Sequence, residues 1–400
     1  MKTIVQEKVS QAVKILREKD IDLWLTFVRE TVAGYDPVLP MIFGKQTLTW
    51  ESALLISATG ETICVLGNLD KTLAEDTGVY ETVIGYDQSI RPALMEVIER
   101  LDPKTIAINQ SKDDVYADGL HHGMYLKLLD FFNGTPYAEH LVSAGEVIAT
   151  LRGRKSPAEI ELLKQSIATA EEIYAETFKQ LSIGQSEAEI AQAMRDNVAE
   201  RGLTTAWAEN SCPGVNVGPE SVLGHASPKD LRVEPGMIVH FDFGVRENGY
   251  CSDIQRMVYF LNDGETQAPE PVQQAFDTII KGLTAAVKAM KPGITGQEVD
   301  AIARKVITDA GYPEFKHATG HQVGLETHDG GTILGPMWER YGSTPLGKLE
   351  ANQVFAVEPT LFLEGYGVLG VEEDVLVTAD GGVFLSNLQT KLILKPYPIK

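Results

Sequence analysis

Four acidic residues stand in segments that are otherwise apolar enough to form buried strands. Asp242 lies in MIVHFDFGV, Asp253 in YCSDIQRMVYFL, Glu358 in VFAVEPTLFL and Glu372 in VLGVEEDVLVT. A lone carboxylate is costly to bury, so such a group is normally hydrogen-bonded, protonated or bound to a metal ion. These four residues are therefore the first candidates for chemistry.

A hairpin signal brings the two aspartates together. Asn248-Gly249 is a strong two-residue turn signal, and it pairs Asp242 with Gln255. Asp253 then lies on the same face as Asp242, diagonally adjacent to it. Two carboxylates in a mostly apolar sheet cannot both ionise unless a cation lies between them, although they could share a proton as an aspartic dyad does.

The last hairpin repeats this arrangement and adds a nitrogen ligand. A three-residue loop at 364–366 places Glu358 opposite Glu372. A single shared proton cannot compensate the negative charge of four carboxylates, whereas two divalent cations supply the four positive charges needed. His321, in HATGHQVGLETHD, is the natural nitrogen ligand, and Gly320 and Gly324 allow the backbone to approach closely. A mixed set of carboxylates and one imidazole suits Mn, Co, Fe or Zn rather than calcium.

Elements to position these residues are predicted along the whole chain. Residues 1–150 alternate helix and strand signals and are expected to form a small α/β domain, with strands at 51–57, 61–67 and 104–109. His121, His122 and His140 lack any ligand spacing, and the adjacent pair is expected on a solvated helix face.

Residues 151–400 are expected to form a second, α+β domain. Three capping boxes start helices, and a further helix is expected at about 270–290. Helices precede a hairpin twice, which predicts antiparallel sheet and an internal duplication of architecture. The capping boxes are Ser156 with Glu159, Ser186 with Glu189 and Thr295 with Glu298, and the strands are 237–245, 250–261, 354–363 and 368–378.

Charge and composition exclude several classes of function. The 400 residues carry a formal charge of −21, which disfavours nucleic acid and anionic membranes as partners. No apolar run is long enough to cross a bilayer and no secretory signal is visible, so a soluble, cytoplasmic protein is expected. The three cysteines, Cys64, Cys212 and Cys251, are too scattered for a disulfide framework or a thiolate metal site.

These motifs together resemble the creatinase/prolidase/aminopeptidase P family of metallopeptidases, whose catalytic domain has the pita-bread fold. The resemblance covers nearly the whole chain, with a small N-terminal domain before the catalytic domain. Its motifs are LRGRKSPAEI (151–160), FDFGVRENGYCSDIQR (241–256), TGHQVGLETHD (319–329), FAVEPTLF (355–362) and VEEDVLVT (371–378).

The resemblance implies a role for each ligand. Asp242 would chelate one metal ion, His321 and Glu358 would hold the other, and Asp253 and Glu372 would bridge both. Glu372 is preferred to Glu373 because it keeps the family's distance to the following strand and because alternation turns Glu373 away.

The resemblance also implies the reaction. A hydroxide that bridges two divalent ions would attack a peptide bond, typically Xaa-Pro. Mn is the first expectation for these ions, and Co, Zn or Fe would also fit. Glu358 would transfer the proton, and His225 and His328 would hydrogen-bond the substrate or the tetrahedral intermediate. The substrate would be a small peptide, and the protein would be a homodimer.

Departures from the family pattern lie near the substrate pocket. Gly370 stands where an arginine is usual, and Asp329-Gly330-Gly331 follows His328 where glutamate and proline are usual. Proline specificity is therefore less firmly implied than metal-dependent hydrolysis, and a hydrolase or lyase acting on a small metabolite is the alternative. A methionine aminopeptidase, creatinase itself and a non-catalytic binding protein fit less well, because of the N-terminal domain and the complete ligand set.

Overall fold

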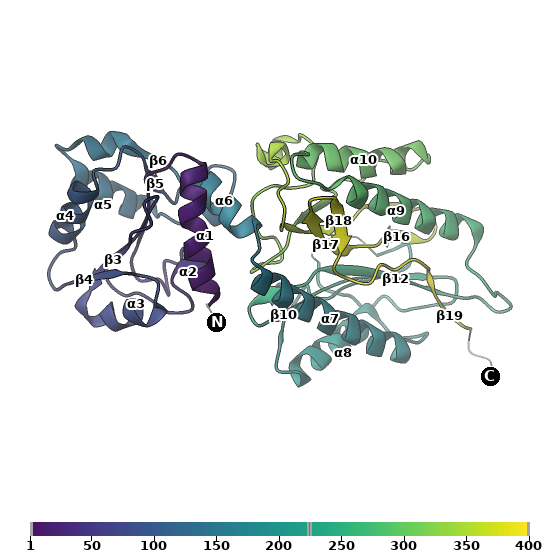
Figure 1. Ribbon diagram of the computed structural model, residues 1–400. Coiled ribbons are helices and arrows are strands. Elements are labelled where there is room, and N and C mark those ends of the chain that lie inside the picture. The colour runs from purple at the N-terminus through teal and green to yellow at the C-terminus, as the bar shows by residue number, and fades with distance from the viewer. Residues whose placement is uncertain (1–2, 222–223, 225, 398–400) are drawn as a thin grey trace. The chain divides into compact units, whose positions relative to one another are not determined.

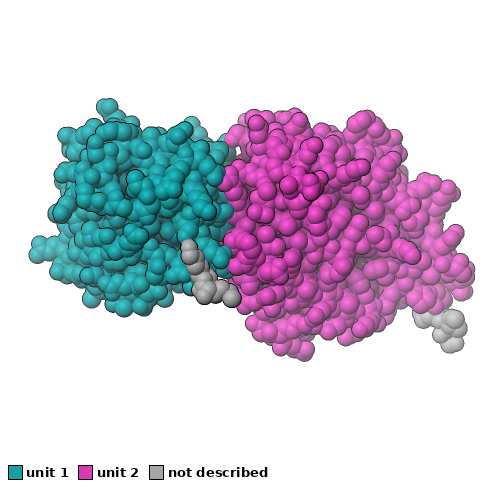
Figure 2. All heavy atoms as spheres, viewed as in Figure 1, with its two compact units in different colours: residues 1–152 teal, residues 153–400 magenta. Residues whose placement is uncertain are grey.

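The computed structural model describes residues 3–221, 224 and 226–397, and the chain divides into two compact units. Unit 1 comprises Met1–Arg152 and unit 2 Gly153–Lys400, as Figure 2 shows in two colours. The sequence placed this boundary between residues 150 and 151. Each unit has a hydrophobic core of its own.

Unit 1 is built on a six-stranded mixed sheet in the order β4-β3-β2-β1-β5-β6. The predicted hairpin joins β2 and β3, which pair antiparallel, whereas β5 runs parallel to β1. Every residue of β1, β2 and β3 is buried, as expected for apolar strands covered by helices. The elements are α1 (Ile4–Glu18), β1 (Leu23–Val28), α2 (Leu39–Ile42), β2 (Ser52–Ser57), β3 (Thr62–Gly67), α3 (Lys71–Thr77), β4 (Thr82–Tyr86), α4 (Arg91–Leu101), β5 (Ile106–Ile108), α5 (His122–Phe132), β6 (Leu141–Ser143) and α6 (Gly145–Gly153).

One polar cluster is enclosed within unit 1. Asn109 accepts a hydrogen bond from the Trp24 indole (2.7 Å) and donates one to Asp36 Oδ2 (2.8 Å). Asp36 Oδ1 also accepts from the backbone N–H of Val38. Burial raises the pKa of Asp36, although these hydrogen bonds oppose the rise.

The helices of unit 2 begin where the sequence predicts. All three predicted capping boxes form. In each, the side chain of the N-terminal Ser or Thr accepts a hydrogen bond from the backbone N–H of the Glu three residues later, and the side chain of that Glu accepts one from the backbone N–H of the Ser or Thr. The helices are α7 (Pro157–Gln180), α8 (Glu187–Glu200), α9 (Glu270–Ala289) and α10 (Gly296–Asp309). Within the described residues, none of the helices of either unit has both the length and the apolar character needed to cross a bilayer.

The four long strands predicted for unit 2 are each interrupted, so the prediction of continuous strands is wrong. The segment 237–245 breaks at Gly244, 250–261 at Ser252-Asp253, 354–363 at Glu358-Pro359 and 368–378 at Val371-Glu372. The strands are β7 (Thr204–Thr205), β8 (Gly214–Val217), β9 (Ile238–Phe243), β10 (Val245–Glu247), β11 (Tyr250–Cys251), β12 (Ile254–Phe260), β13 (Gly320–Gln322), β14 (Val354–Val357), β15 (Thr360–Leu363), β16 (Gly367–Gly370), β17 (Glu373–Thr378), β18 (Gly381–Phe384) and β19 (Ile393–Lys395).

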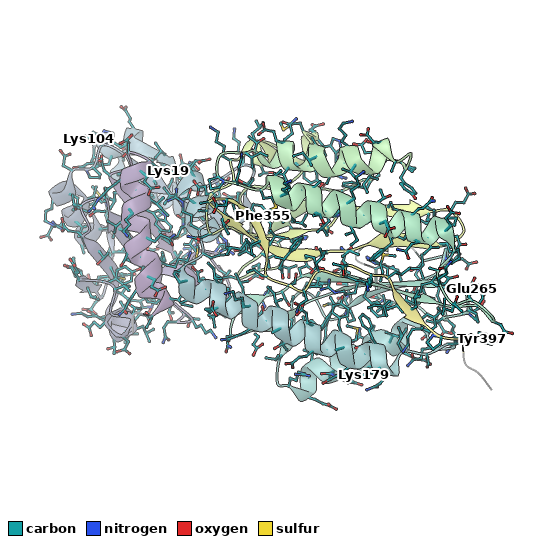
Figure 3. The ribbon with its side chains drawn as sticks, turned by 45° about the vertical axis from the view of Figure 1, so that its right-hand side comes forward. Lys19, Lys104, Lys179, Glu265, Phe355 and Tyr397 are labelled. Carbon is teal, nitrogen blue, oxygen red and sulfur yellow. The ribbon has the colours of Figure 1, made fainter. Side chains whose placement is uncertain are left out.

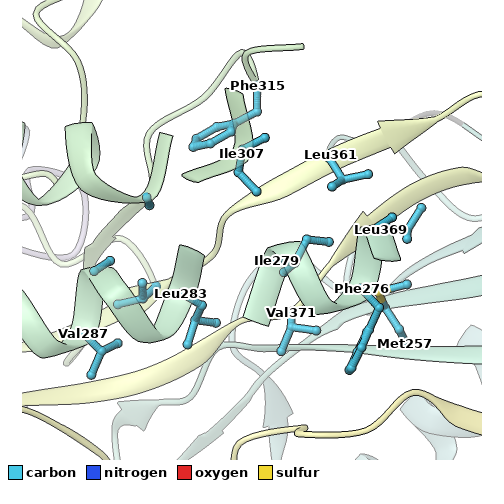
Figure 4. Packing of buried hydrophobic residues seen from close by; sticks show 14 of the residues in the cluster. Met257, Phe276, Ile279, Leu283, Val287, Ile307, Phe315, Leu361, Leu369 and Val371 are labelled. Carbon is cyan, nitrogen blue, oxygen red and sulfur yellow. The ribbon is translucent and has the colours of Figure 1, made fainter. Parts of the chain in front are cut away.

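Two helix pairs cover opposite faces of these strands, which is the duplicated architecture that the sequence predicts (Figure 1). Helices α7 and α8 pack on β8, β10 and β11, and α9 packs on β15, β16 and β18. In the core under α9, Phe276, Ile279 and Leu283 are buried against Leu369 and Val371 (Figure 4). Phe355 lies inside unit 2, whereas Lys179 and Glu265 lie at its margin (Figure 3).

Candidate metal centre

The first hairpin has the register that its turn predicts. Glu247 pairs with Tyr250 in β10–β11, and Asp242 pairs with Gln255 in β9–β12. The carboxyl groups of Asp242 and Asp253 are close enough that each affects the pKa of the other. Gly244 makes this close packing possible, because a Cβ there would lie 1.8 Å from the carbonyl oxygen of Ser252.

The second hairpin also keeps its predicted register on both sides of the interruption. Thr360 pairs with Gly370 in β15–β16, and Val357 pairs with Glu373 in β14–β17. The same offset holds for both pairs, so Glu358 stands opposite Glu372 where the ladder is broken. The strands β16 and β9 pack side by side, which brings the two hairpins together.

Three of the four interruptions lie at candidate ligands, and this explains why those strands are not continuous. At three of the four acids the backbone N–H leaves its own strand ladder and bonds elsewhere, so each side chain can turn inward. The acceptors are Asp374 Oδ2 for Asp253 (3.1 Å), Thr319 O for Glu358 (2.7 Å) and Gln255 O for Glu372 (3.4 Å).

His321 on β13 faces the acids. Its Nε2 lies 3.5 Å from Asp253 Oδ2 and 3.7 Å from Glu358 Oε1. Potential ligand atoms of Asp253, His321 and Glu372 all lie within 4.8 Å of one another. Gly320 permits the approach of β13 to β14, because a Cβ there would lie 2.1 Å from the carbonyl oxygen of Ala356.

The electrostatics of this cluster are unfavourable without a cation. Burial raises the pKa of all four acids, and for Asp253, Glu358 and Glu372 the neighbouring carboxylates raise it further. Burial lowers the pKa of His321, and the nearby His328 lowers it further, so this imidazole is neutral at pH 7. A neutral imidazole is the form that binds a metal ion.

The donor atoms fit a metal site. Three buried carboxylate oxygens in the cluster accept no hydrogen bond: Asp242 Oδ1, Asp253 Oδ1 and Glu372 Oε2. Unpaired buried oxygens are rare in proteins and require an explanation, which a bound cation supplies. Carboxylate oxygens with one imidazole nitrogen are the ligands that Mn, Co, Fe and Zn accept. The residues present therefore fit divalent metal ions.

The turn after β13 places His328 against His321, with ring centroids 4.1 Å apart. A buried ion pair holds this turn, because Lys155 Nζ lies 2.8 Å from Asp329 Oδ2 and both side chains are almost fully buried. Gly324 leaves room for the pair, since a Cβ there would lie 2.1 Å from Asp329 Oδ2. The other predicted histidine, His225, lies outside the described residues.

Glu373 takes no part in the cluster. Its carboxylate accepts hydrogen bonds from both terminal nitrogens of Arg256, at 3.0 and 3.1 Å, and from Ser386 Oγ. The strand alternation that the sequence indicated therefore turns Glu373 away from Glu372. The sequence reasoning named Gln255 only as a partner in register, and it passed over His240, although both carry polar side chains in apolar strands.

Comparison with known proteins agrees with this geometry. The sequence profile of metallopeptidase family M24 matches residues 161–379, which is more than half of the chain. The protein belongs to this family. It is therefore a metallopeptidase with a peptide substrate.

Relatives and solved structures extend the likeness beyond the catalytic unit. An uncharacterized peptidase of Staphylococcus saprophyticus is 28% identical over 340 residues, 84% of this chain and 88% of the relative. Dipeptidase PepE from Mycobacterium ulcerans is 25% identical, with a TM-score of 0.75 and coverage of 98% of each chain. An X-Pro aminopeptidase from Thermotoga maritima is 25% identical, with a TM-score of 0.71 and coverage of 97% of this chain and 99% of that one. A Xaa-Pro dipeptidase from Bacillus anthracis shares the fold at 22% identity, with a TM-score of 0.75, covering 98% and 100%. The likeness to these structures thus covers both parts of the chain, the smaller N-terminal α/β domain and the pita-bread domain that follows it.

Proposed function

We propose that this metallopeptidase holds two divalent ions, Mn in the first place, and cleaves Xaa-Pro peptide bonds. The observation that carries the proposal is the set of three buried carboxylate oxygens without hydrogen bonds beside His321 Nε2. The Xaa-Pro preference is supported by the similar structures of an X-Pro aminopeptidase and a Xaa-Pro dipeptidase.

Five residues would hold the ions. Asp242 would bind one, His321 and Glu358 the other, and Asp253 and Glu372 both. When bound, the ions would neutralise the acids, lower the pKa of a water molecule to make it a nucleophile and polarise the scissile carbonyl.

The chain's own side chains would orient the substrate and move the proton. Glu358 keeps part of its side chain accessible, at 20% exposure, so it can take the proton from the attacking water and pass it to the leaving nitrogen. His328, against His321, would donate a hydrogen bond to the substrate carbonyl as its oxygen gains charge. His225 is proposed for a similar contact from the sequence alone.

A substrate panel tests the proposal. The full-length protein is assayed with Mn, Co or Zn on Ala-Pro, on Xaa-Pro-Xaa peptides and on Met-Ala-Xaa peptides. We expect turnover of one of the first two classes, and which one decides between dipeptidase and aminopeptidase. Turnover of none of the peptides by the metal-loaded protein would contradict the proposal and favour a small-metabolite substrate.

Removal of the ions and of one ligand provides the controls. EDTA should abolish turnover, and Mn should restore it. Asp253→Asn should abolish turnover while the far-UV circular dichroism spectrum stays that of the wild type. Homodimer formation and a cytoplasmic location stay predictions, which light scattering and cell fractionation test.

A further inference from the structure

A buried pair of polar side chains lies directly behind Glu358. Gln255, which is 1% exposed, donates from Nε2 to Glu358 Oε2 at 3.1 Å. Its Oε1 lies 2.9 Å from Nε2 of His240, which is fully buried. The His240 Nδ1 in turn lies 3.2 Å from the side-chain amide of Asn216, which must turn its NH₂ group toward this nitrogen when His240 Nε2 carries the hydrogen. A chain of hydrogen bonds thus runs from the interior of the sheet to the candidate metal ligand.

The direction of this chain follows from what each group can donate. A carboxylate that binds a metal ion only accepts hydrogen bonds, so Gln255 must turn its NH₂ group toward Glu358. Its Oε1 then faces His240, and the imidazole Nε2 must carry a hydrogen and donate it. His240 therefore decides which way the Gln255 amide points. With the amide reversed, two oxygens would face each other across the contact to Glu358.

Gly370 provides the space for this pair. A Cβ at position 370 would lie 2.5 Å from Gln255 Oε1 and 2.9 Å from His240 Nε2. Neither side chain has room to move aside, because both are buried between β9, β12 and β16. The glycine, which is one of the departures from the family pattern in the sequence, belongs with His240 and Gln255 as one packing unit.

We propose that His240 and Gln255 are positioning residues for Glu358. They hold its Oε2 in a hydrogen bond to Gln255, so that Oε1 is turned toward His321 and Asp253. The Glu358 Oε1 atom lies 3.7 Å from His321 Nε2, which is where a shared ion would bind. This inference rests on the proposed function, because it assigns Glu358 its orientation as a metal ligand. Partners that hold a ligating carboxylate or imidazole commonly change metal affinity when they are removed.

The test is titration of the metal-free, full-length protein with Mn²⁺ alone, by calorimetry in competition with a chelator. Gln255→Met keeps the volume of the side chain and removes both hydrogen bonds. We expect it to weaken Mn²⁺ binding by about 10- to 100-fold. Gly370→Ala should weaken it in the same direction, because its methyl group displaces the amide.

A pair of variants at His240 separates positioning from packing. His240→Leu should weaken Mn²⁺ binding like Gln255→Met, whereas His240→Gln, which keeps an N–H donor near the position of Nε2, should retain most of the wild-type affinity. Combining His240→Leu with Gln255→Met should add little to either single change, because both break the same chain. These comparisons distinguish positioning of Glu358 from packing even where one variant is less stable.

Gln389 provides a matched control. It is another buried glutamine, in the segment between β18 and β19, and it bonds through both side-chain polar atoms to the backbone of Met257 on β12. Gln389→Met should lower the melting temperature and leave Mn²⁺ affinity unchanged.

Two outcomes have different meanings. Wild-type affinity in Gln255→Met, or equal loss in His240→Leu and His240→Gln, would overturn the positioning role while the proposed function stands. Failure of the wild-type protein itself to bind Mn²⁺ would overturn both.

Discussion

Replacement of Lys155 by methionine tests how the turn behind the candidate metal centre is held. Lys155 Nζ lies 2.8 Å from Asp329 Oδ2, with side-chain exposures of 1% and 2%. Asp329 also shapes the turn, since its N–H donates to Gln322 O (2.8 Å) and its Oδ1 accepts from Glu326 N (3.2 Å). Methionine keeps the length of the lysine side chain and removes only the ammonium group.

The size of the effect follows from this burial. Breaking a buried ion pair by removing one partner costs about 3–5 kcal/mol, because the remaining charge stays in a poorly solvated site. For a unit of the size of unit 2, this corresponds to a fall of roughly 10 °C in melting temperature. Turnover should also fall, because His328 immediately precedes Asp329.

Urea denaturation of the full-length protein measures the loss, and two comparisons control it. Lys164→Met, on α7 shortly after Lys155, removes an exposed pair with Glu161 (exposures 47% and 65%), and it should cost less than about 1 kcal/mol. The double variant Lys155→Met/Asp329→Asn should recover part of the stability, because no charge remains buried. A cost for Lys155→Met no larger than that of Lys164→Met would refute the reasoning.

Three further predictions follow from the packing and charges of both units. Arg304→Met should lower the free energy of unfolding by about 2–3 kcal/mol, because Arg304 pairs with Asp300 (2.7 Å) and donates to the carbonyls of Phe315 and His317; urea denaturation checks this, and an unchanged midpoint would contradict it. Phe276→Ala should cost about 3–5 kcal/mol, because the side chain is fully buried under α9; calorimetric unfolding checks this, and a loss below 1 kcal/mol, roughly that of a surface change, would speak against the packing. Asp36→Asn should gain stability relative to the wild type as pH rises from about 4 to 8. Burial raises the pKa of Asp36 in the folded protein, so ionising this carboxyl lowers the free energy of unfolding. This loss is absent below the unfolded pKa near 3.9 and grows as pH rises through the folded pKa. Denaturation curves at several pH values measure this slope, and a difference between the two proteins that is independent of pH would exclude it.

The sequence was informative where a residue type dictates its local structure. The capping boxes at Ser156, Ser186 and Thr295 start their helices as predicted, because the side chain and backbone groups that they satisfy lie within three residues. Asn248-Gly249 gave the register of Asp242 with Gln255 for the same reason, since a two-residue turn leaves one choice of pairing.

The sequence was uninformative where distant segments decide the outcome. The breaks in the strands at Asp253, Glu358 and Glu372 depend on acceptors far away in the chain, such as Thr319 O and Asp374 Oδ2. Strand propensity and the alternation of apolar and polar residues depend only on neighbours in the sequence, so they predicted continuous strands. The contact of His240 with Gln255 follows from the register of β9 and β12, but the approach of this pair to Glu358 and Gly370 was invisible, because it requires the two hairpins to be packed together.

Metal content tests the central claim most directly. The full-length protein is loaded with Mn²⁺, dialysed against metal-free buffer and analysed by elemental mass spectrometry, beside Asp253→Asn treated in the same way. The account predicts about two ions per wild-type chain and a clear loss in the variant, because Asp253 is one of the three residues whose potential ligand atoms lie within 4.8 Å of one another. A wild-type protein that retains no ion, or a variant that retains as many as the wild type, would contradict it.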